Sequence, residues 1–443
     1  MRLLHVIAGA PVGGAETFAQ DAILALHGRG LWQRVICRPY PALKARFIAA
    51  RLEMMPFAFS LADRLRGRGR VIRAAAQEAD LVHAWMSRAN SFIPARMPCP
   101  VIGWFGDYYD LKYFRRADCF FCVTPDIARH VIANGAPPHR VFMLNTFGTM
   151  PEAARISRAA LDTPADARVL LVLARLHGVK GIDTMLEALV RLPDCTLWVA
   201  GDGPERASLE ALAARLGVDR RVRFLGWRGD RKALLEAADI CVLPSRYEPF
   251  GTVIVEAWAA GRPLVATRAD GARQYVRDGE NGLLCPIDDV TALASCLRRV
   301  LDEPGLAARL IAGGSAAYQA DFTREIVTDR LLAAYSRCLE LGERRFDTLV
   351  EVADLDPVRL DALKSAAGGG PHAAALAAVA LAHGARGATA ARLEAAWPGA
   401  LLRERGRRVL CLDERALDHS AALLPTDAGQ GVPDRLLAAL KVD

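Results

Sequence analysis

The chain alternates between short apolar segments and longer amphipathic ones. Six apolar segments in the first half fit β-strands, at 3–8, 34–37, 80–84, 101–105, 119–123 and 141–144. After the first of them, Gly13-Gly14 forms a turn that leads into a predicted helix over 15–27. Strands that alternate with helices in this way are typical of a parallel sheet with helical crossovers.

The alternation lapses over 152–167, a polar segment with proline and aspartate that we interpret as a linker. Six further strands then fit 169–173, 196–200, 222–225, 240–243, 264–266 and 282–285, and a helix over 323–341 closes this half. We therefore predict an α/β fold with two consecutive Rossmann-like, doubly wound domains, 1–160 and 161–343, that face a cleft.

The segment 344–443 has a different character. It is rich in alanine and glycine over 366–400, with predicted helices at 373–383 and from Thr389 to Trp397, and a short strand or hairpin arm at 407–412. We predict a small, mostly helical appended domain, whose role the sequence does not indicate.

The composition of the 443-residue chain is that of a globular protein, with 24% charged and 52% hydrophobic residues. No apolar run reaches the roughly 18 to 20 residues of a membrane span, and Met1 to Ile7 fits a first strand better than a signal peptide. Cys119 and Cys122 form a C-x-x-C inside an apolar run, which favours a buried strand over a zinc site. Scattered cysteines and no export signal predict a cytoplasmic protein.

The net charge of +7 is concentrated between Pro41 and Ala75. Eight cations there, Lys44, Arg46, Arg51, Arg64, Arg66, Arg68, Arg70 and Arg73, are interleaved with apolar residues such as Phe47, Ile48, Leu52, Phe57 and Phe59. A basic amphipathic segment suits an anionic membrane surface. The alternative is a solvated helix whose apolar side packs on its own domain. Nucleic acid is not expected, because 64–73 has no aromatic residues to stack on bases.

The stretch from Glu248 to Glu256 indicates a ligand with an anionic centre. The predicted strand 240–243 leads into Pro249-Phe250-Gly251, and a helix opens near Thr252, a candidate N-cap. The first amides of a helix, here those of Thr252 and Val253, favour an anion. Carboxylates on both sides of such a turn suit a phosphate flanked by hydroxyls, as in a nucleotide-sugar.

Two further loops fit the same ligand. Arg175 and Lys180, five residues apart after the strand 169–173, can both contact a diphosphate. The adjacent amides of Gly13-Gly14 can meet a phosphate or sugar, although a plain tight turn also explains them. Trp227, after the strand 222–225, can stack on a base or serve as an ordinary rim aromatic.

Together these motifs resemble the retaining family 4 glycosyltransferases of the GT-B fold, over residues 1–340 and most clearly over 169–286. The resemblance places Glu248 beside the donor sugar as the catalytic residue and Glu256 on the ribose hydroxyls. It assigns the donor-binding residues Gly13, Gly14, Arg175, Lys180, Trp227, Phe250, Gly251, Thr252 and Val253. It makes 1–160 the acceptor domain and 161–343 the donor domain, with the chain returning after 323–341 to brace the first domain.

The first domain departs from the family pattern. His83 matches a common histidine at a strand end, but Trp85 stands where a second histidine is usual. After 101–104, where the family often carries a histidine, this chain has Phe105-Gly106-Asp107. Gln274 stands where a glutamate is frequent. We place His83 and Asp107 on the acceptor side.

The resemblance implies a retaining, metal-independent hexosyltransferase, since residues 1–343 contain no Asp-x-Asp triplet to hold a cation. UDP-hexose is the favoured donor and GDP-mannose the next, and the expected acceptor is a glycan or lipid-linked hydroxyl in envelope polysaccharide synthesis. Two alternatives share this architecture: a sugar-nucleotide epimerase, which needs no acceptor, and a non-catalytic sugar-nucleotide-binding protein.

Overall fold

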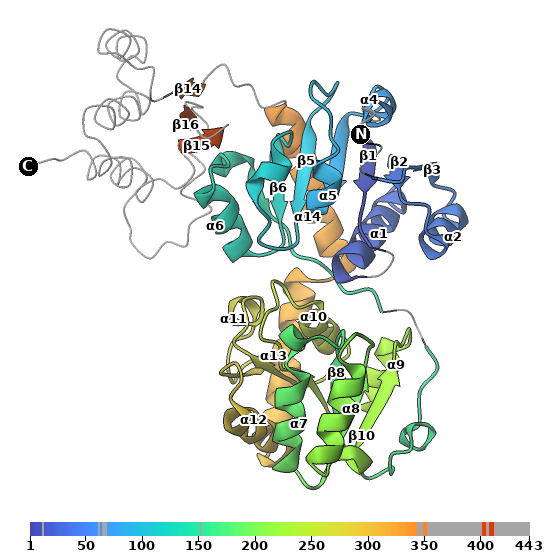
Figure 1. The fold of residues 1–443 in the computed structure, drawn as a ribbon, viewed down its shortest axis with the longest axis vertical. Helices are drawn as coiled ribbons and strands as arrows, with labels where there is room; N and C mark the ends of the chain where they lie inside the picture. Colours follow the sequence, from blue (N-terminus) through green and yellow to red (C-terminus); the bar gives the residue numbers. More distant parts are fainter. Residues whose placement is uncertain are drawn as a thin grey trace, which may run out of the picture. The chain divides into compact units, whose positions relative to one another are not determined.

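A computed structural model describes residues 1–10, 13–60, 63, 69–150, 153–342, 349–351, 401–404 and 407–411. The chain divides into two compact units, residues 1–144 with 331–443 (unit 1) and residues 145–330 (unit 2). Each unit contains its own parallel sheet (Figure 1). The predicted domain limits of 160 and 343 stay a prediction.

Unit 1 holds a seven-stranded sheet in the order β3-β2-β1-β4-β5-β6-β7, with every pair parallel. Its strands are β1 Arg2–Ile7, β2 Trp32–Cys37, β3 Glu53–Pro56, β4 Leu81–Trp85, β5 Val101–Phe105, β6 Cys119–Cys122 and β7 Val141–Met143. Its helices are α1 Gly14–His27, α2 Pro41–Ala49, α4 Arg70–Ala76, α5 Met86–Asn90 and α6 Pro125–Ala133. Six of the strands were predicted, and β3 was not.

Unit 2 holds a six-stranded parallel sheet in the order β10-β9-β8-β11-β12-β13. Its strands are β8 Arg168–Leu173, β9 Cys195–Ala200, β10 Val222–Gly226, β11 Ile240–Leu243, β12 Leu264–Thr267 and β13 Leu283–Cys285. Its helices are α7 Ile182–Val190, α8 Arg206–Arg215, α9 Arg231–Ala237, α10 Thr252–Ala259, α11 Ala272–Tyr275, α12 Val290–Asp302 and α13 Leu306–Asp321. The predicted α/β fold with two doubly wound sheets is confirmed.

The closing helix, α14 Arg324–Leu341, was predicted within one residue. From residue 331 onward it belongs to unit 1, where Tyr335 is fully buried and its hydroxyl lies 2.6 Å from His83 Nδ1. Buried Arg140 donates to the carbonyls of Leu341 and Gly342 at the end of the helix. These bonds satisfy carbonyl groups that have no partner within the helix. The expected return of the chain to the first unit is therefore confirmed.

The apolar residues of the basic stretch are core residues, which corrects the interpretation of 41–75 as a single amphipathic face. Phe47, Leu52, Phe57 and Phe59 are all at most 7% exposed. Part of the stretch is the edge strand β3, which pairs with β2 and in which Met54 and Met55 are half-buried. Ile48 is an exception at 57% exposed. Arg64, Arg66 and Arg68 lie outside the described residues.

The described residues of the tail form a small antiparallel sheet, β14-β16-β15. Its strands are β14 Leu349–Glu351, β15 Leu401–Glu404 and β16 Arg407–Cys411. The predicted hairpin arm at 407–412 is thus a strand that pairs with β15 and β14. The helices predicted at 373–383 and 389–397 lie outside the described residues.

Candidate functional site

The donor-side residues of unit 2 lie at one edge of its sheet. The loop 174–181 follows β8 and the loop 244–251 follows β11, and these two strands are direct neighbours. Because the carboxyl ends of parallel strands meet at the same edge, the fold brings the two loops together. Gly181 permits this close approach: it has φ of +60°, and a Cβ at this position would lie 2.0 Å from the Pro244 carbonyl oxygen.

The two loops meet through an ion pair between Lys180 and Glu248. Lys180 Nζ lies 2.7 Å from Glu248 Oε2, and the side chains are only 22% and 16% exposed. The Ser245 hydroxyl donates a longer bond of 3.4 Å to the same carboxylate oxygen. Two residues nominated separately from the sequence are thus in direct contact, whereas Arg175, earlier in the same loop, is exposed.

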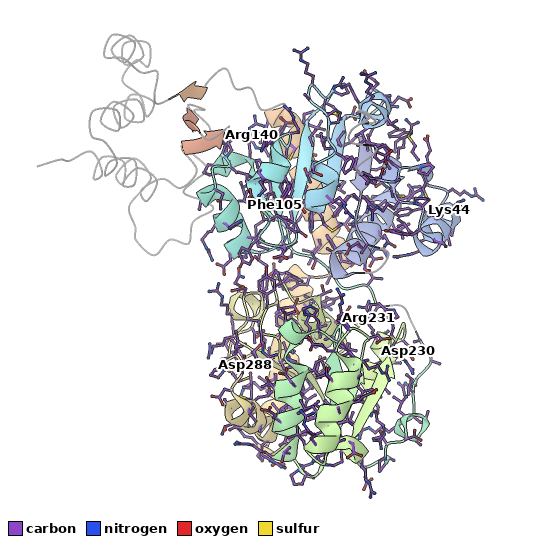
Figure 2. The ribbon with its side chains drawn as sticks, viewed as in Figure 1. Lys44, Phe105, Arg140, Asp230, Arg231 and Asp288 are labelled. Atoms are coloured by element: carbon purple, nitrogen blue, oxygen red, sulfur yellow. The ribbon has the colours of Figure 1, made fainter. Side chains whose placement is uncertain are left out.

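Arg246 also joins the loops and was missed in the sequence. Its backbone amide donates to the Val179 carbonyl over 2.8 Å, and its guanidinium donates to the Gly178 carbonyl over 2.6 Å. The same guanidinium pairs with Asp183 and Asp288, the latter labelled in Figure 2. Hydrogen bonds to Asp183 are the largest cause of its raised pKa. Arg246 is therefore a fixed cross-link between the loops that carry Lys180 and Glu248.

The helix after Glu248 begins as predicted, but its cap is different. Gly251, with φ of +88°, is the N-cap and Thr252 is the first helical residue, so the prediction of Thr252 as the cap was wrong. A left-handed residue is needed there, and a Cβ at Gly251 would lie 2.9 Å from Ile254 Cδ1. The amides of Thr252 and Val253 remain in the first turn of α10, where an anion is favoured.

Phe250 is placed with its ring in the interior of unit 2. It is 7% exposed and packs on Tyr275 and Phe322, with ring centroids 5.4 and 6.3 Å away. Donor contact by Phe250 would therefore come from its backbone. Trp227, just after β10, is the opposite case, because 65% of it is exposed.

Glu256 lies in the second turn of α10 and is only 1% exposed. Its Oε1 is 2.7 Å from Nη1 of Arg231, the first residue of α9. Arg231 also donates to the Thr149 carbonyl at 3.2 Å. A carboxylate this buried needs a compensating cation, and no local motif predicts that Arg231 provides it.

The residues predicted for the site in unit 1 include Gly13 and Gly14 at the start of α1 and Asp107 after β5. Gly14 opens α1 and Gly13 caps it with an extended backbone, and a Cβ at Gly13 would lie 2.1 Å from Glu16 Oε2. The Glu16 carboxylate accepts the Ala10 amide over 2.9 Å. Asp107 follows β5, and its Oδ1 accepts the Tyr108 amide over 2.7 Å.

His83 is a core residue of unit 1. It is fully buried, stacks on Trp85 at 3.9 Å between ring centroids, and contacts Tyr335 through Nδ1. Burial lowers its pKa well below the usual range, and the nearby His5 adds to this effect, so it is neutral at pH 7. Its assignment to the acceptor side stays a prediction.

The described part of the chain contains neither a membrane-spanning helix nor a cluster of metal ligands. No helix there is long and apolar enough to cross a bilayer. No cluster of three or more His, Cys, Asp or Glu side chains in it is arranged to hold a metal ion. The expected independence of a metal stays a prediction.

Comparison with known proteins decides the family. The model of the family "Glycosyl transferases group 1" matches residues 154–316. The lipopolysaccharide core biosynthesis glycosyltransferase LpsE of Rhizobium meliloti is 38% identical over 72% of this chain and 95% of LpsE. The protein belongs to the group 1 glycosyltransferases. LpsD of the same organism, also a lipopolysaccharide core biosynthesis glycosyltransferase, is 34% identical over 76% of this chain and 98% of LpsD.

Solved structures agree on the fold of this glycosyltransferase. The crystal structure of Anabaena HepE in complex with UDP and glucose has a TM-score of 0.67 at 24% identity, and the match covers 76% of this chain and 99% of HepE. The GT-B fold expected from the sequence is confirmed.

Proposed function

We propose that this glycosyltransferase is a retaining hexosyltransferase that uses a nucleoside-diphosphate sugar and needs no metal. The observation that carries the proposal is the Lys180–Glu248 contact of 2.7 Å beside the first turn of α10. A cation, a carboxylate and free helix amides converge there at the carboxyl edge of the sheet. This combination suits a substrate that carries an anionic leaving group next to a sugar.

The leaving diphosphate is stabilised by Arg175, Lys180 and the amides of Thr252 and Val253. Lys180 rests on Glu248 without a ligand, and an arriving diphosphate, with its greater charge, competes for the ammonium group. Glu248 is then released toward the sugar, where it accepts hydroxyl hydrogen bonds and stabilises positive charge on the ring. Each well-placed donor to a developing anion contributes about 3 kcal/mol. In the retaining reaction, attack and departure take place on the same face.

UDP-hexose is the favoured donor and GDP-mannose the next. HepE, the structural relative above, was solved with UDP and glucose. In addition, Asp230 is the only carboxylate of the loop 226–230, and it already accepts two bonds from Arg228, of 2.8 and 2.5 Å. A guanine-binding site commonly has a carboxylate that accepts hydrogen bonds from the N–H groups of the base. Because Asp230 is already paired with Arg228, the loop favours uracil over guanine.

The proposed acceptor is a hydroxyl of a lipid-linked or core glycan of the envelope, in line with the names of LpsE and LpsD. The proposed location is the cytoplasmic face of the inner membrane. Because most apolar residues of 41–75 are buried in the core, the proposed membrane contact is made by the exposed residues Lys44, Ile48 and Arg51. Lys44 projects from α2 in Figure 2.

Calorimetry with UDP, GDP, ADP and their hexose conjugates, with and without a chelator, tests the donor assignment. We expect UDP and UDP-hexose to bind most tightly, equally well in chelator, and at least tenfold more weakly to Glu256→Ala. Arg298→Ala, which removes an exposed arginine paired with Asp194, is the matched control and should bind normally. Tighter binding of GDP, or loss of binding in chelator, would contradict the donor or the metal assignment respectively.

A further inference from the structure

Arg231 has no role in the function proposed above, although it contacts Glu256 of the donor side. Its guanidinium bridges the most buried carboxylate of the donor side, Glu256, and the carbonyl of Thr149, with contacts of 2.7 and 3.2 Å. Arg231 itself is 32% exposed, whereas Glu256 is 1% exposed. Arg231 therefore lies between the Glu256 carboxylate and solvent. Figure 2 labels Arg231 on α9, next to Asp230.

The aliphatic part of the Glu256 side chain packs on the first residues of unit 2. A Cβ on Gly148 would lie 2.8 Å from Glu256 Cγ. Three residues earlier, Asn145 Oδ1 accepts the Tyr275 hydroxyl over 3.1 Å. Thr146 and Phe147 are buried as well. The segment 145–149, which enters unit 2 from unit 1, thus packs along the carboxylate side chain and holds the cation that pairs with it.

We propose that Arg231 is a positioning residue of the nucleotide site, which fixes the Glu256 carboxylate against segment 145–149 in the orientation that accepts the ribose hydroxyls. This inference rests on the proposed function and on the family resemblance, which places Glu256 on the ribose hydroxyls. A carboxylate offers about four lone-pair sites, which is enough to pair with an arginine and to accept the two hydroxyls of a ribose. A fixed acceptor also binds a diol better than a mobile one, because less side-chain freedom is lost on binding.

The ratio of the dissociation constants of 2′-deoxy-UDP and UDP reports this role directly. A hydrogen bond to a charged group corresponds to a preference of about tenfold to a hundredfold, so we expect the wild type to favour UDP by that factor. In Arg231→Ala we expect the ratio to fall below about threefold, because UDP binds more weakly while 2′-deoxy-UDP changes little. A purely structural role would weaken both nucleotides alike and leave the ratio unchanged.

Additional variants keep the test decisive if Arg231→Ala folds poorly. Arg231→Lys retains the charge but loses the forked contact to Glu256 and Thr149, and should give an intermediate ratio. Gly148→Ala changes no charge but displaces the Glu256 side chain, and should lower the ratio as well. In a Glu256→Gln background, Arg231→Ala should no longer change the ratio. Arg298→Ala is the matched control, with a similar exposure of 36% and a carboxylate partner.

The two ways to fail are distinguishable. A wild type that favours UDP, combined with Arg231→Ala and Arg231→Lys proteins that keep the full preference, would overturn the role of Arg231 and leave the proposed function standing. A wild type without any preference for UDP over 2′-deoxy-UDP would overturn the ribose assignment of Glu256 and this inference with it.

Discussion

Charged side chains on the donor side of unit 2 are held by partners from other loops. Glu248 contacts Lys180, Glu256 contacts Arg231, and Arg246 contacts Asp183 and Asp288. Each contact is partly shielded from water. Charge pairs in such a shielded position interact more strongly than pairs at the surface. Lys180, Glu248 and Glu256 are therefore already paired before a ligand arrives, and an anionic ligand exchanges partners with them.

Lys180→Ala tests this exchange. We predict that the variant lowers kcat/KM for transfer from UDP-hexose at least tenfold, or about 1.4 kcal/mol in the transition state, because a donor to the leaving diphosphate is lost. Release of UDP in the presence of acceptor is the measurement. Lys112→Ala, which removes an exposed lysine 2.6 Å from Asp110, is the control. Near-normal turnover in a folded Lys180→Ala protein would remove Lys180 from the mechanism.

At the scale of single elements, the sequence predicted most of what the structure contains. Apolar runs between turn residues marked twelve of the strands now seen, and Val101–Phe105 and Ile240–Leu243 have the predicted limits. The strand β3 was missed because it is only four residues long, its only half-buried side chains are Met54 and Met55, and it lies in a stretch that also fits an amphipathic face. The cap of α10 was assigned to Thr252 because its side chain suits the role, while close packing of Ile254 and Glu248 requires Gly251.

The site was predictable only in part. Lys180, Glu248 and Glu256 stand in recognisable local motifs, and the first two prove to be in contact. Arg231 and Arg246 carry no such signal, because the tertiary fold brings Glu256 of α10 to the start of α9 and Asp183 of α7 to the loop 244–251. Pairings across the fold of this kind are a property of tertiary structure, which a single sequence does not display.

The exposed side of α2 gives a prediction at the element scale. Lys44, Ile48 and Arg51 are exposed, whereas Arg46 is engaged by Asp21. We expect Lys44→Glu with Arg51→Glu to reduce co-sedimentation with vesicles that contain anionic lipid several-fold, since each basic residue contributes about 1 kcal/mol near such a surface. Arg277→Glu, at a residue 79% exposed in unit 2, is the control. Equal sedimentation of the double variant and the wild type would count against a membrane role of α2.

At the scale of the whole molecule, α14 ties the two ends of the glycosyltransferase portion together. Its last residues belong to unit 1 although more than 180 residues of unit 2 intervene in the sequence. Inside unit 1, Tyr335 of α14 meets His83, and His83 in turn lies beside His5, with ring centroids 5.9 Å apart. The docking of α14 therefore rests on a buried cluster that contains two histidines.

This cluster predicts acid sensitivity. Gln33 donates to the Ile23 carbonyl, so its Oε1 accepts from His5 Nε2, and His5 Nδ1 is left to accept from Trp85. That arrangement needs a neutral ring, and burial accordingly lowers the pKa of His5 from 6.5 to about 4. Between these values the unfolded chain binds the proton and the folded chain does not. The contribution of His5 to stability is thus complete above pH 6.5 and is lost as the pH falls toward 4.

We expect the titration of His5 to lower the free energy of unfolding by roughly 3 kcal/mol between pH 7 and pH 4, as measured by urea denaturation at several pH values. His5→Gln removes the titration while it keeps a donor and an acceptor at the site, so it should be less stable at pH 7 but lose less stability on acidification. His177→Gln, at an exposed histidine of unit 2, should keep the wild-type slope. An unchanged slope in His5→Gln would show that the acid sensitivity of unit 1 originates elsewhere. His83, which faces both His5 and Tyr335, would then be the group to replace next, since its pKa is lowered by the same burial.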